Sequence, residues 1–550
     1  MFDNNKVLVI ISSLNNSTNI PRKNARLINE KPLIAYAIDM AKSSHYVDDI
    51  VVASDDSEIR MIADLFGASN VRISNEVEDK NDLNAVIYDA LIQKEKQAFD
   101  EYDIVISLSP DSPLLKVESL NKAIEKFANF GVDSVISVRE DRHLSWSYDS
   151  ENQIFFPLYS QRTDRENLPL ELVETGNFLL TRRGFLSPES FLGMNLDVVP
   201  VSGVEAVKVE NYDDFWVAEK HINKKTIAIV VNAFDEIGTS HIYRCLTLAS
   251  KLIFHDVVFV LNENYELGVN IIRKYGYNHV LYNESSQILD TLHNIGTDLV
   301  INDVLDTSIE YISALKNNGF FVVNFQDLGP GIEVADLVFN AFYEYDYDAD
   351  NVFTGHEYYL LRDEFYLQQP KIISDEVKNV LITFGGVDYH NLTEKVLKAL
   401  IATGFSKYIN VVLGVGYPNK EEIMDRFAMY NNVIIHEDVN SISELMVKAD
   451  IIFTSGSGSM YEACSLGVPS IVLCDNERDL NNAFGNFENG IVNLGLGTEV
   501  SEETIIENFN ELKDNFELRQ EINQKMLSID LKHGFENVWS KIKVNFLKEM

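Results

Sequence analysis

The sequence is poor in cysteine and has no long apolar run, and each shortage argues against a class of protein. Only three cysteines occur in 550 residues. Cys245, Cys464 and Cys474 form no close pair and no metal-binding spacing, which argues against a disulfide framework or a zinc site. No apolar run reaches the about 18 residues that a membrane span requires. Because the N-terminus also lacks a signal-peptide pattern, we expect a cytoplasmic protein with no membrane span.

Basic residues are scarce relative to acidic ones. The chain has 46 Lys and Arg against 85 Asp and Glu, a formal net charge of −39. A surface this acidic repels the backbone of nucleic acids and anionic membranes, so we expect neither partner. Nucleotides remain candidate ligands, because a few backbone N–H groups at the start of a helix can hold a phosphate locally.

Short runs rich in Val and Ile alternate with amphipathic segments of helical period along the whole chain. Runs that are apolar on both faces are typical of strands buried in a parallel sheet, so the pattern predicts an α/β fold. The predicted strands are Val7–Ile11, Ile50–Ala53, Ile104–Leu108, Ser134–Val138, Thr226–Val231, Val257–Leu261, Leu299–Asn302, Phe320–Asn324, Val380–Phe384, Val411–Gly414, Ile451–Thr454 and Ser470–Leu473. Polar breaks at His221–Lys225 and Gln368–Glu376 predict domains at 1–222, 226–370 and 371–550.

Several motifs in the first domain follow predicted strands, where open α/β sheets bind ligands. They are Ile20-Pro21-Arg22-Lys23-Asn24, Ser54-Asp55-Asp56, Asp111-Ser112-Pro113-Leu114, Glu174-Thr175-Gly176-Asn177 and Val209-Glu210-Asn211. In order and spacing they resemble the CMP-sugar synthetases, the cytidylyltransferases that activate acidic sugars such as sialic and pseudaminic acid.

The resemblance implies a glycosyltransferase-A-like nucleotidyltransferase domain that couples CTP to an acidic sugar and uses Mg²⁺. It assigns Asp111 and Glu210 to the metal, although Asp111 between two prolines also suits a turn. The nucleotide and sugar would contact Arg22, Lys23, Asn24, Asp55, Ser112, Gly176 and Asn177.

The first domain departs from the family pattern at four positions. Leu14 and Thr18 stand where the family has cations, Leu115 replaces a sugar-contacting Arg, and Lys208 replaces the first carboxylate of the metal pair. Losing cations that would face a triphosphate removes the charge neutralisation that the transfer needs. We therefore expect the fold to be retained and leave open whether the domain is catalytic.

The second predicted domain begins with a strand, a glycine-bearing loop and a helix with His241 and Arg244 in its first turn. A His at that sheet edge is placed to meet a substrate and titrates near neutral pH. We take His241, Arg244 and the loop residue Asp235 as candidate catalytic residues, with a buried structural His as the alternative reading.

Two glycine-containing loops in the third predicted domain suit a nucleotide diphosphate. Small residues expose backbone N–H groups, and the following helix favours an anion. We expect Glu462, one helical turn further on, to contact the ribose, with a solvated helix acid as the alternative. The predicted nucleotide-binding residues are Gly238, Gly385, Gly386, Ser455, Gly456, Ser457, Gly458, Ser459, Glu462 and Asn476.

Residues 226–500 resemble the UDP-sugar hydrolase of pseudaminic acid biosynthesis and its relatives in spore-coat polysaccharide synthesis. The resemblance implies a two-lobed glycosyltransferase-B-like fold, in which His241 assists the attack of water on the sugar and UDP departs. Asn232, Ser240 and Ser457 depart from the family pattern and are compatible with another substrate or with sugar transfer.

The sequence therefore supports three hypotheses. The chain is a bifunctional CMP-sugar synthetase and UDP-sugar hydrolase of nonulosonate biosynthesis, or a hydrolase or glycosyltransferase active only in its C-terminal part, or a non-enzymatic nucleotide-sugar scaffold. We favour an enzyme that binds CTP or CMP, UDP and nucleotide sugars. A homo-oligomer is compatible with the sequence.

Overall fold

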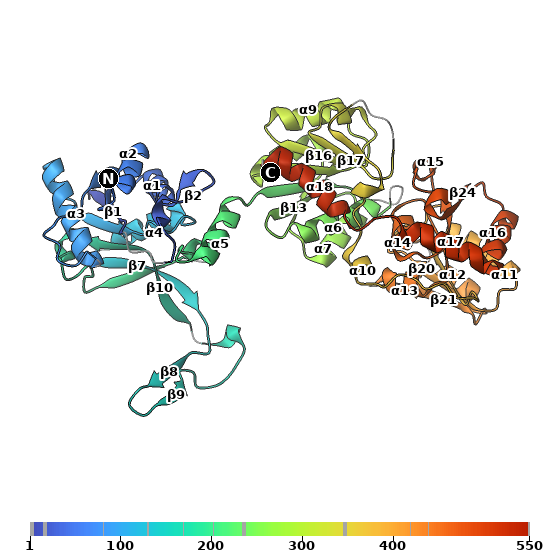
Figure 1. The fold of residues 1–550 in the computed structure, drawn as a ribbon, viewed down its shortest axis with the longest axis horizontal. Coiled ribbons are helices and arrows are strands. Elements are labelled where there is room, and N and C mark those ends of the chain that lie inside the picture. Colours follow the sequence, from blue (N-terminus) through green and yellow to red (C-terminus); the bar gives the residue numbers. More distant parts are fainter. Residues whose placement is uncertain are drawn as a thin grey trace. The chain divides into compact units, whose positions relative to one another are not determined.

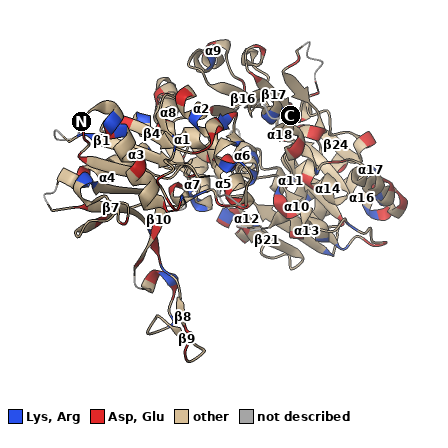
Figure 2. Ribbon diagram, turned by 60° about the vertical axis from the view of Figure 1, so that its left-hand side comes forward, with Lys and Arg blue, Asp and Glu red and all other residues tan. Residues whose placement is uncertain are grey.

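The computed structural model describes residues 5–14, 19–80, 82–128, 131–168, 170–201, 203–233, 238–344, 349–418, 420–437, 439 and 441–547. The chain divides into two compact units, unit 1 (Met1–Lys224) and unit 2 (Lys225–Met550), each built from sheets covered by helices (Figure 1). Acidic positions are spread along both units, in keeping with the net charge (Figure 2). Among the described helices, none is long and apolar enough to cross a bilayer.

Unit 1 contains one seven-stranded sheet with β1 (Val7–Ser12) near its centre. Its spatial order is β11 (Leu196–Pro200), β7 (Ser134–Asp141), β10 (Glu171–Arg182), β6 (Ile104–Leu108), β1, β4 (Asp49–Ala53) and β5 (Ser69–Val71). The strands β6 and β4 flank β1 in parallel, whereas β10 runs antiparallel to β6 and β7. The carboxyl ends of β1 and β6 therefore meet at one edge.

Helices cover both faces of this sheet because alternate residues of β1 enter two separate cores. Val7, Val9 and Ile11 pack with α1 (Leu33–Ser43), α2 (Ser57–Leu65) and α4 (Val117–Glu125). Leu8 and Ile10 pack with α3 (Leu83–Ala98) on the other face. Unit 1 ends with α5 (Tyr212–Ile222), whose first turn is closed by a capping box between Asn211 and Asp214.

A hairpin of β8 (Trp146–Asp149) and β9 (Ile154–Pro157) lies beyond the ends of β7 and β10 (Figure 1). The strand β10 shifts register against β7 between Glu174 and Leu179, and Gly176 there has a φ of 66°. Such a bulge bends the strand, and the positive φ favours glycine. A further small ribbon pairs β2 (Leu27–Ile28) with β3 (Lys31–Pro32).

Unit 2 contains two parallel sheets, one of seven and one of six strands, and the order is the same over six strands. In the first lobe the order is β14 (His279–Tyr282), β13 (Asp256–Asn262), β12 (Thr226–Val231), β15 (Leu299–Asp303), β16 (Phe321–Phe325), β17 (Leu337–Asn340) and β18 (Val352–Thr354). In the second lobe it is β21 (Val433–Glu437), β20 (Tyr408–Leu413), β19 (Asn379–Thr383), β22 (Ile451–Thr454), β23 (Ser470–Cys474) and β24 (Ile491–Leu496). These orders confirm the predicted fold class, a nucleotidyltransferase-like domain followed by a two-lobed module.

Helices connect the parallel strands, as a parallel sheet requires. The first lobe has α6 (Ser240–Lys251), α7 (Glu266–Tyr275), α8 (Ile288–Asn294) and α9 (Ile309–Asn317). The short α10 (Asp363–Tyr366) links the lobes, and its Phe365 is buried in the core of the second lobe. The second has α11 (Leu392–Ala402), α12 (Lys420–Phe427), α13 (Ile442–Lys448), α14 (Gly458–Leu466), α15 (Glu477–Leu480), α16 (Glu502–Asp514) and α17 (Phe516–Leu527).

The last helix, α18 (Gly534–Ile542), follows the second lobe in sequence but packs on the first (Figure 1). Val538 and Ile542 are fully buried in the same core as Ile227 and Ile229 of β12. The chain thus passes between the lobes twice, and both lobes belong to one compact unit.

Candidate functional site

In each lobe, successive strands are added first on one side of the first strand and then on its other side. This switch lies between β12 and β15 in the first lobe and between β19 and β22 in the second. Loops that leave neighbouring strands on opposite sides of a sheet open a crevice at the carboxyl edge, where such folds bind ligands. The helix α6 follows β12, and α14 follows β22. The sequence therefore places its His-bearing helix and its small-residue loop at these two crevices.

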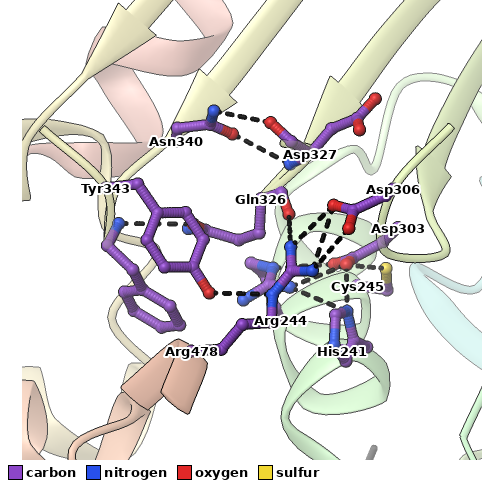
Figure 3. Close-up of polar contacts among 11 residues, drawn as sticks. His241, Arg244, Cys245, Asp303, Asp306, Gln326, Asp327, Asn340, Tyr343 and Arg478 are labelled. Atoms are coloured by element: carbon purple, nitrogen blue, oxygen red, sulfur yellow. Dashed lines mark hydrogen bonds and ion pairs between the residues drawn. The ribbon is translucent and has the colours of Figure 1, made fainter. Parts of the chain in front are cut away.

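His241 and Arg244 lie three residues apart in the first turn of α6 and both reach Asp303 at the end of β15 (Figure 3). His241 Nδ1 contacts Asp303 Oδ1. Arg244 binds the same carboxylate through two nitrogens, with Nε to Oδ2 and Nη2 to Oδ1 each at 2.7 Å. Residues three apart share one helix face, and Asp303 is aligned with Val231 of β12.

Asp303 is fully buried, and its charge state follows from these contacts. Burial alone raises the pKa of a carboxyl, but the charges of Arg244 and His241 and their hydrogen bonds outweigh burial and lower the pKa of Asp303 to about 2. His241 Nδ1 contacts this carboxylate, which only accepts hydrogen bonds, and also lies 3.0 Å from Arg244 Nη2, which only donates them. When the Nδ1 proton is directed to Asp303, the other ring nitrogen, Nε2, is the one that can accept a proton.

Two cavities lie along the crevices of unit 2. The His241 cavity has a volume of about 360 Å³ and the Glu462 cavity about 450 Å³. The predicted residues Gly238, His241, Ser455, Ser457 and Asn476 line the former, and Gly458, Ser459 and Glu462 line the latter. Both are lined by Thr239, Ser240, Arg244, Phe342, Gly385 and Gly386, so the cavities adjoin each other.

The Glu462 side chain is buried and engaged by Arg362, which directly precedes α10. Arg362 Nε donates to Glu462 Oε1 at 2.6 Å, and Arg362 Nη1 lies 2.9 Å from Glu364. Burial raises the pKa of the Glu462 carboxyl, and Arg362 partly opposes this shift. The solvated-acid alternative for Glu462 is therefore wrong.

Gly456, in contrast, has a packing role in the small-residue loop. A Cβ at this position would lie 3.0 Å from Cys474 Sγ and 3.1 Å from the Asp479 carbonyl. Its own carbonyl accepts a hydrogen bond from Asn482 Nδ2 at 2.8 Å. Unlike its neighbours Ser455 and Ser457, Gly456 does not line either cavity.

Arg478 of the second lobe contacts three residues of the first lobe across the His241 cavity (Figure 3). Its guanidinium binds both oxygens of Asp306 at 3.0 Å, the Gln326 carbonyl at 2.9 Å and Tyr343 Oη at 3.1 Å. A planar guanidinium fits a carboxylate through two parallel bonds, so this contact fixes orientation as well as distance.

The lobes also approach closely at Gly386. A Cβ there would lie 1.8 Å from Thr239 Oγ1 of the first lobe. Within the second lobe, a Cβ at Gly414 would lie 2.3 Å from the Gly385 carbonyl. Both separations are shorter than any real contact, so these positions require glycine for steric reasons.

In unit 1, the predicted metal residue Asp111 is held by two lysines. Lys23 Nζ lies 2.5 Å from Asp111 Oδ2, and Lys208 Nζ lies 4.0 Å from Oδ1. The side chains of Lys23 and Asp111 are 14% and 11% exposed. Because cations occupy both sides of this carboxylate, the residues present do not fit a divalent cation held by Asp111 and Glu210. Across the described ranges, no three His, Cys, Asp or Glu side chains gather as metal ligands.

Some of the other predicted residues of unit 1 lie next to the cluster formed by Lys23, Asp111 and Lys208. Asn177 Nδ2 donates to Ser112 Oγ at 2.9 Å, and Asn24 Nδ2 donates to Ser13 Oγ at 2.8 Å. Gly176 lies beside Lys208, whose Nζ would be 3.5 Å from a Cβ added at the glycine.

Two predicted residues of unit 1 engage other partners. Arg22 pairs with Glu58, and Asp55 pairs with Lys80 at 2.7 Å. Leu14 occupies a position where the related family has a cationic residue, and it packs against the apolar core around Leu8. Thr18 and the candidate catalytic residue Asp235 lie outside the described residues.

Three residues of unit 2 escaped the sequence prediction, namely Asp303, Asp306 and Arg362. Asp303 directly follows the predicted strand Leu299–Asn302, and a carboxylate at the end of a buried parallel strand is a usable signal. Its pairing with His241 depends on the register of β12 against β15, which no local pattern reveals.

Both halves of the chain are similar to known protein families. Residues 8–162 match the cytidylyltransferase family model, and residues 379–535 match that of the glycosyltransferase family 28 C-terminal domain. MJ1062, an uncharacterized protein of Methanocaldococcus jannaschii, is 31% identical over 46% of this chain and 56% of its own length. The chain thus spans little more than half of that relative.

Two further relatives match about half or most of the chain. The spore coat polysaccharide biosynthesis protein SpsG of Bacillus subtilis is 26% identical over 53% of this chain and 90% of its own length. The pseudaminic acid cytidylyltransferase and UDP-2,4-diacetamido-2,4,6-trideoxy-beta-L-altropyranose hydrolase of Helicobacter pylori is 21% identical over 85% of this chain and 88% of its own length. Both predicted resemblances are confirmed: the N-terminal part of the chain is similar to cytidylyltransferases and the C-terminal part to the C-terminal domain of glycosyltransferase family 28.

Proposed function

We propose that unit 2 hydrolyses a UDP-linked amino sugar and that unit 1 binds CTP, so that the chain serves the biosynthesis of a nonulosonate. The observation that carries the hydrolase is the buried contact of His241 with Asp303 beside a cavity of about 360 Å³. A histidine held in this way is oriented as a general base. The relative from Helicobacter pylori, which aligns over most of both chains, is named for a corresponding pair of activities.

The reaction uses water as the nucleophile. His241 Nε2 accepts a proton from water while the water oxygen forms a bond to the anomeric carbon of the sugar. The bond between that carbon and the diphosphate oxygen breaks, and its electron pair leaves with UDP. The Asp303 carboxylate stabilises the imidazolium that forms, because its pKa of about 2 keeps it ionised at neutral pH.

The Glu462 cavity suits the nucleoside diphosphate. Backbone N–H groups at the start of the nine-residue α14 favour an anion, and Gly385, where a Cβ would meet no atom within 4 Å, leaves room for it. The apolar residues Val412, Leu413 and Ile442 line the same cavity and offer a surface for the base. Because the two cavities share residues, a sugar attached to this diphosphate would extend toward His241.

Release of UDP from UDP-linked amino sugars tests the hydrolase. We expect His241→Ala to lower kcat about 10²- to 10⁴-fold, the range for loss of a general base. His279→Ala is the matched control, since His279 lies on β14 and lines neither cavity. Equal activity of wild type and His241→Ala, or no turnover by either, would contradict the proposal.

Water labelled with oxygen-18 tests the position of attack. We expect the label in the anomeric hydroxyl of the sugar, because water bonds to carbon. Label in UDP would mean attack on phosphorus instead. UDP release only when an acceptor sugar is added would identify a glycosyltransferase, the second function that the sequence leaves open.

A further inference from the structure

The metal position of unit 1 carries a cluster that the family resemblance does not explain. Lys23 and Lys208 both lie within 4.0 Å of the Asp111 carboxylate at the carboxyl edge of the sheet. Two positive charges and one negative charge give the cluster a net charge of +1. A pair of carboxylates in this place would carry −2 and would need a divalent cation before a polyphosphate could approach.

From this charge balance we infer that unit 1 binds the triphosphate of a nucleotide through the ammonium groups of Lys23 and Lys208, without a divalent cation. The inference rests on the proposed binding of CTP and concerns how the phosphates are held. Ammonium groups donate hydrogen bonds directly to phosphate oxygens, so they replace the neutralising role of a metal ion.

The backbone around the cluster supports a built site. Lys23 follows β1 and Asp111 follows β6, the two adjacent parallel strands whose carboxyl ends meet. The Val209 amide donates to the Asp111 carbonyl at 2.9 Å, which anchors the segment that carries Lys208. Gly176, with its φ of 66° at the bulge of β10, leaves space beside Lys208 Nζ.

Two buried amide oxygens next to the cluster lack a hydrogen-bond partner. Within the described part of the chain, no donor reaches Asn24 Oδ1 or Asn177 Oδ1. Asn177 is fully buried, and its Nδ2 binds Ser112, the neighbour of Asp111. Buried acceptors are normally satisfied, so these oxygens point to a ligand that donates hydrogen bonds, such as an amino group of a base or a sugar hydroxyl.

Calorimetric titration of the full chain with CTP, in Mg²⁺ and in EDTA, tests the inference. UDP at saturation would occupy unit 2 during both titrations. For the wild type we expect dissociation constants for CTP that agree within about threefold in the two buffers. For Lys208→Asp, which turns the net charge to −1, we expect binding at least tenfold weaker in EDTA than in Mg²⁺.

Lys122→Asp is the control, because it changes the charge by the same amount as Lys208→Asp. Lys122 is exposed on α4 and lies outside the cluster. If Lys208→Asp does not fold, Lys208→Ala replaces it, with tenfold weaker binding expected in both buffers. Wild-type binding that EDTA abolishes would overturn the inference and leave CTP binding intact. Absence of CTP binding in both buffers would overturn both.

Discussion

At the scale of single residues, the charge on Asp303 couples the site of unit 2 to its stability. The carboxyl is fully buried and has a pKa of about 2 when folded, against about 3.9 for an unfolded aspartate. The ionised form therefore stabilises the folded state above about pH 4, and this contribution is lost as the pH falls through 2. Each pKa unit corresponds to about 1.4 kcal/mol, so the full contribution is about 2.6 kcal/mol, of which about 2 kcal/mol is lost between pH 5 and pH 2.

Urea unfolding at a series of pH values measures this contribution. We expect the free energy of unfolding of the wild type to fall by about 2 kcal/mol more than that of Asp303→Asn between pH 5 and pH 2. Asp290→Asn, at an exposed position of α8, is the control and should keep the wild-type slope. Parallel curves for the wild type and Asp303→Asn would show that folding does not lower the pKa of Asp303.

Gly386 gives a steric prediction at the same scale. A methyl group there overlaps Thr239 Oγ1, so Gly386→Ala should push the lobes apart and weaken UDP binding at least tenfold. In a Thr239→Gly background, Gly386→Ala should weaken UDP binding much less, because the overlapping side chain is gone. Calorimetry on the four proteins measures the coupling, and an equal loss in both backgrounds would contradict the steric explanation.

At the scale of elements, buried strands such as β1, β12 and β15 were predicted, whereas β10, which runs antiparallel to both of its neighbours, was not. Runs of Val and Ile mark β1, β12 and β15 because both faces of these strands are covered. The strand β10 is partly exposed and interrupted by its bulge, so Glu171–Arg182 has no continuous apolar pattern. Local composition therefore identifies a strand most readily where the strand carries a continuous apolar run.

The same limit applies to the candidate site. His241 and the Ser455–Ser459 loop stand out in the sequence because each is a local motif at the start of a helix. Arg478 reaches Asp306 across 172 residues of sequence, and Arg362 reaches Glu462 across 100. Such pairs depend on how the lobes pack, which periodicity and spacing do not encode.

At the scale of the whole molecule, the two units have separate sheets and separate cores. The segment 225–550 should therefore fold alone and hydrolyse the UDP-sugar with a kcat/KM within about twofold of the full chain. Expression of this segment followed by the UDP-release assay makes the test. Loss of activity despite a native thermal transition would mean that unit 1 contributes to the reaction of unit 2.

The return of α18 to the first lobe has a consequence for biosynthesis. Val538 and Ile542 complete a core whose first strand, β12, leaves the ribosome about 300 residues earlier, since β12 spans Thr226–Val231. Domains usually fold as they are synthesised, beginning from the N-terminus. Here the first lobe of unit 2 keeps an exposed apolar surface until the second lobe and α18 have been translated. The nascent chain therefore most needs a chaperone during this interval.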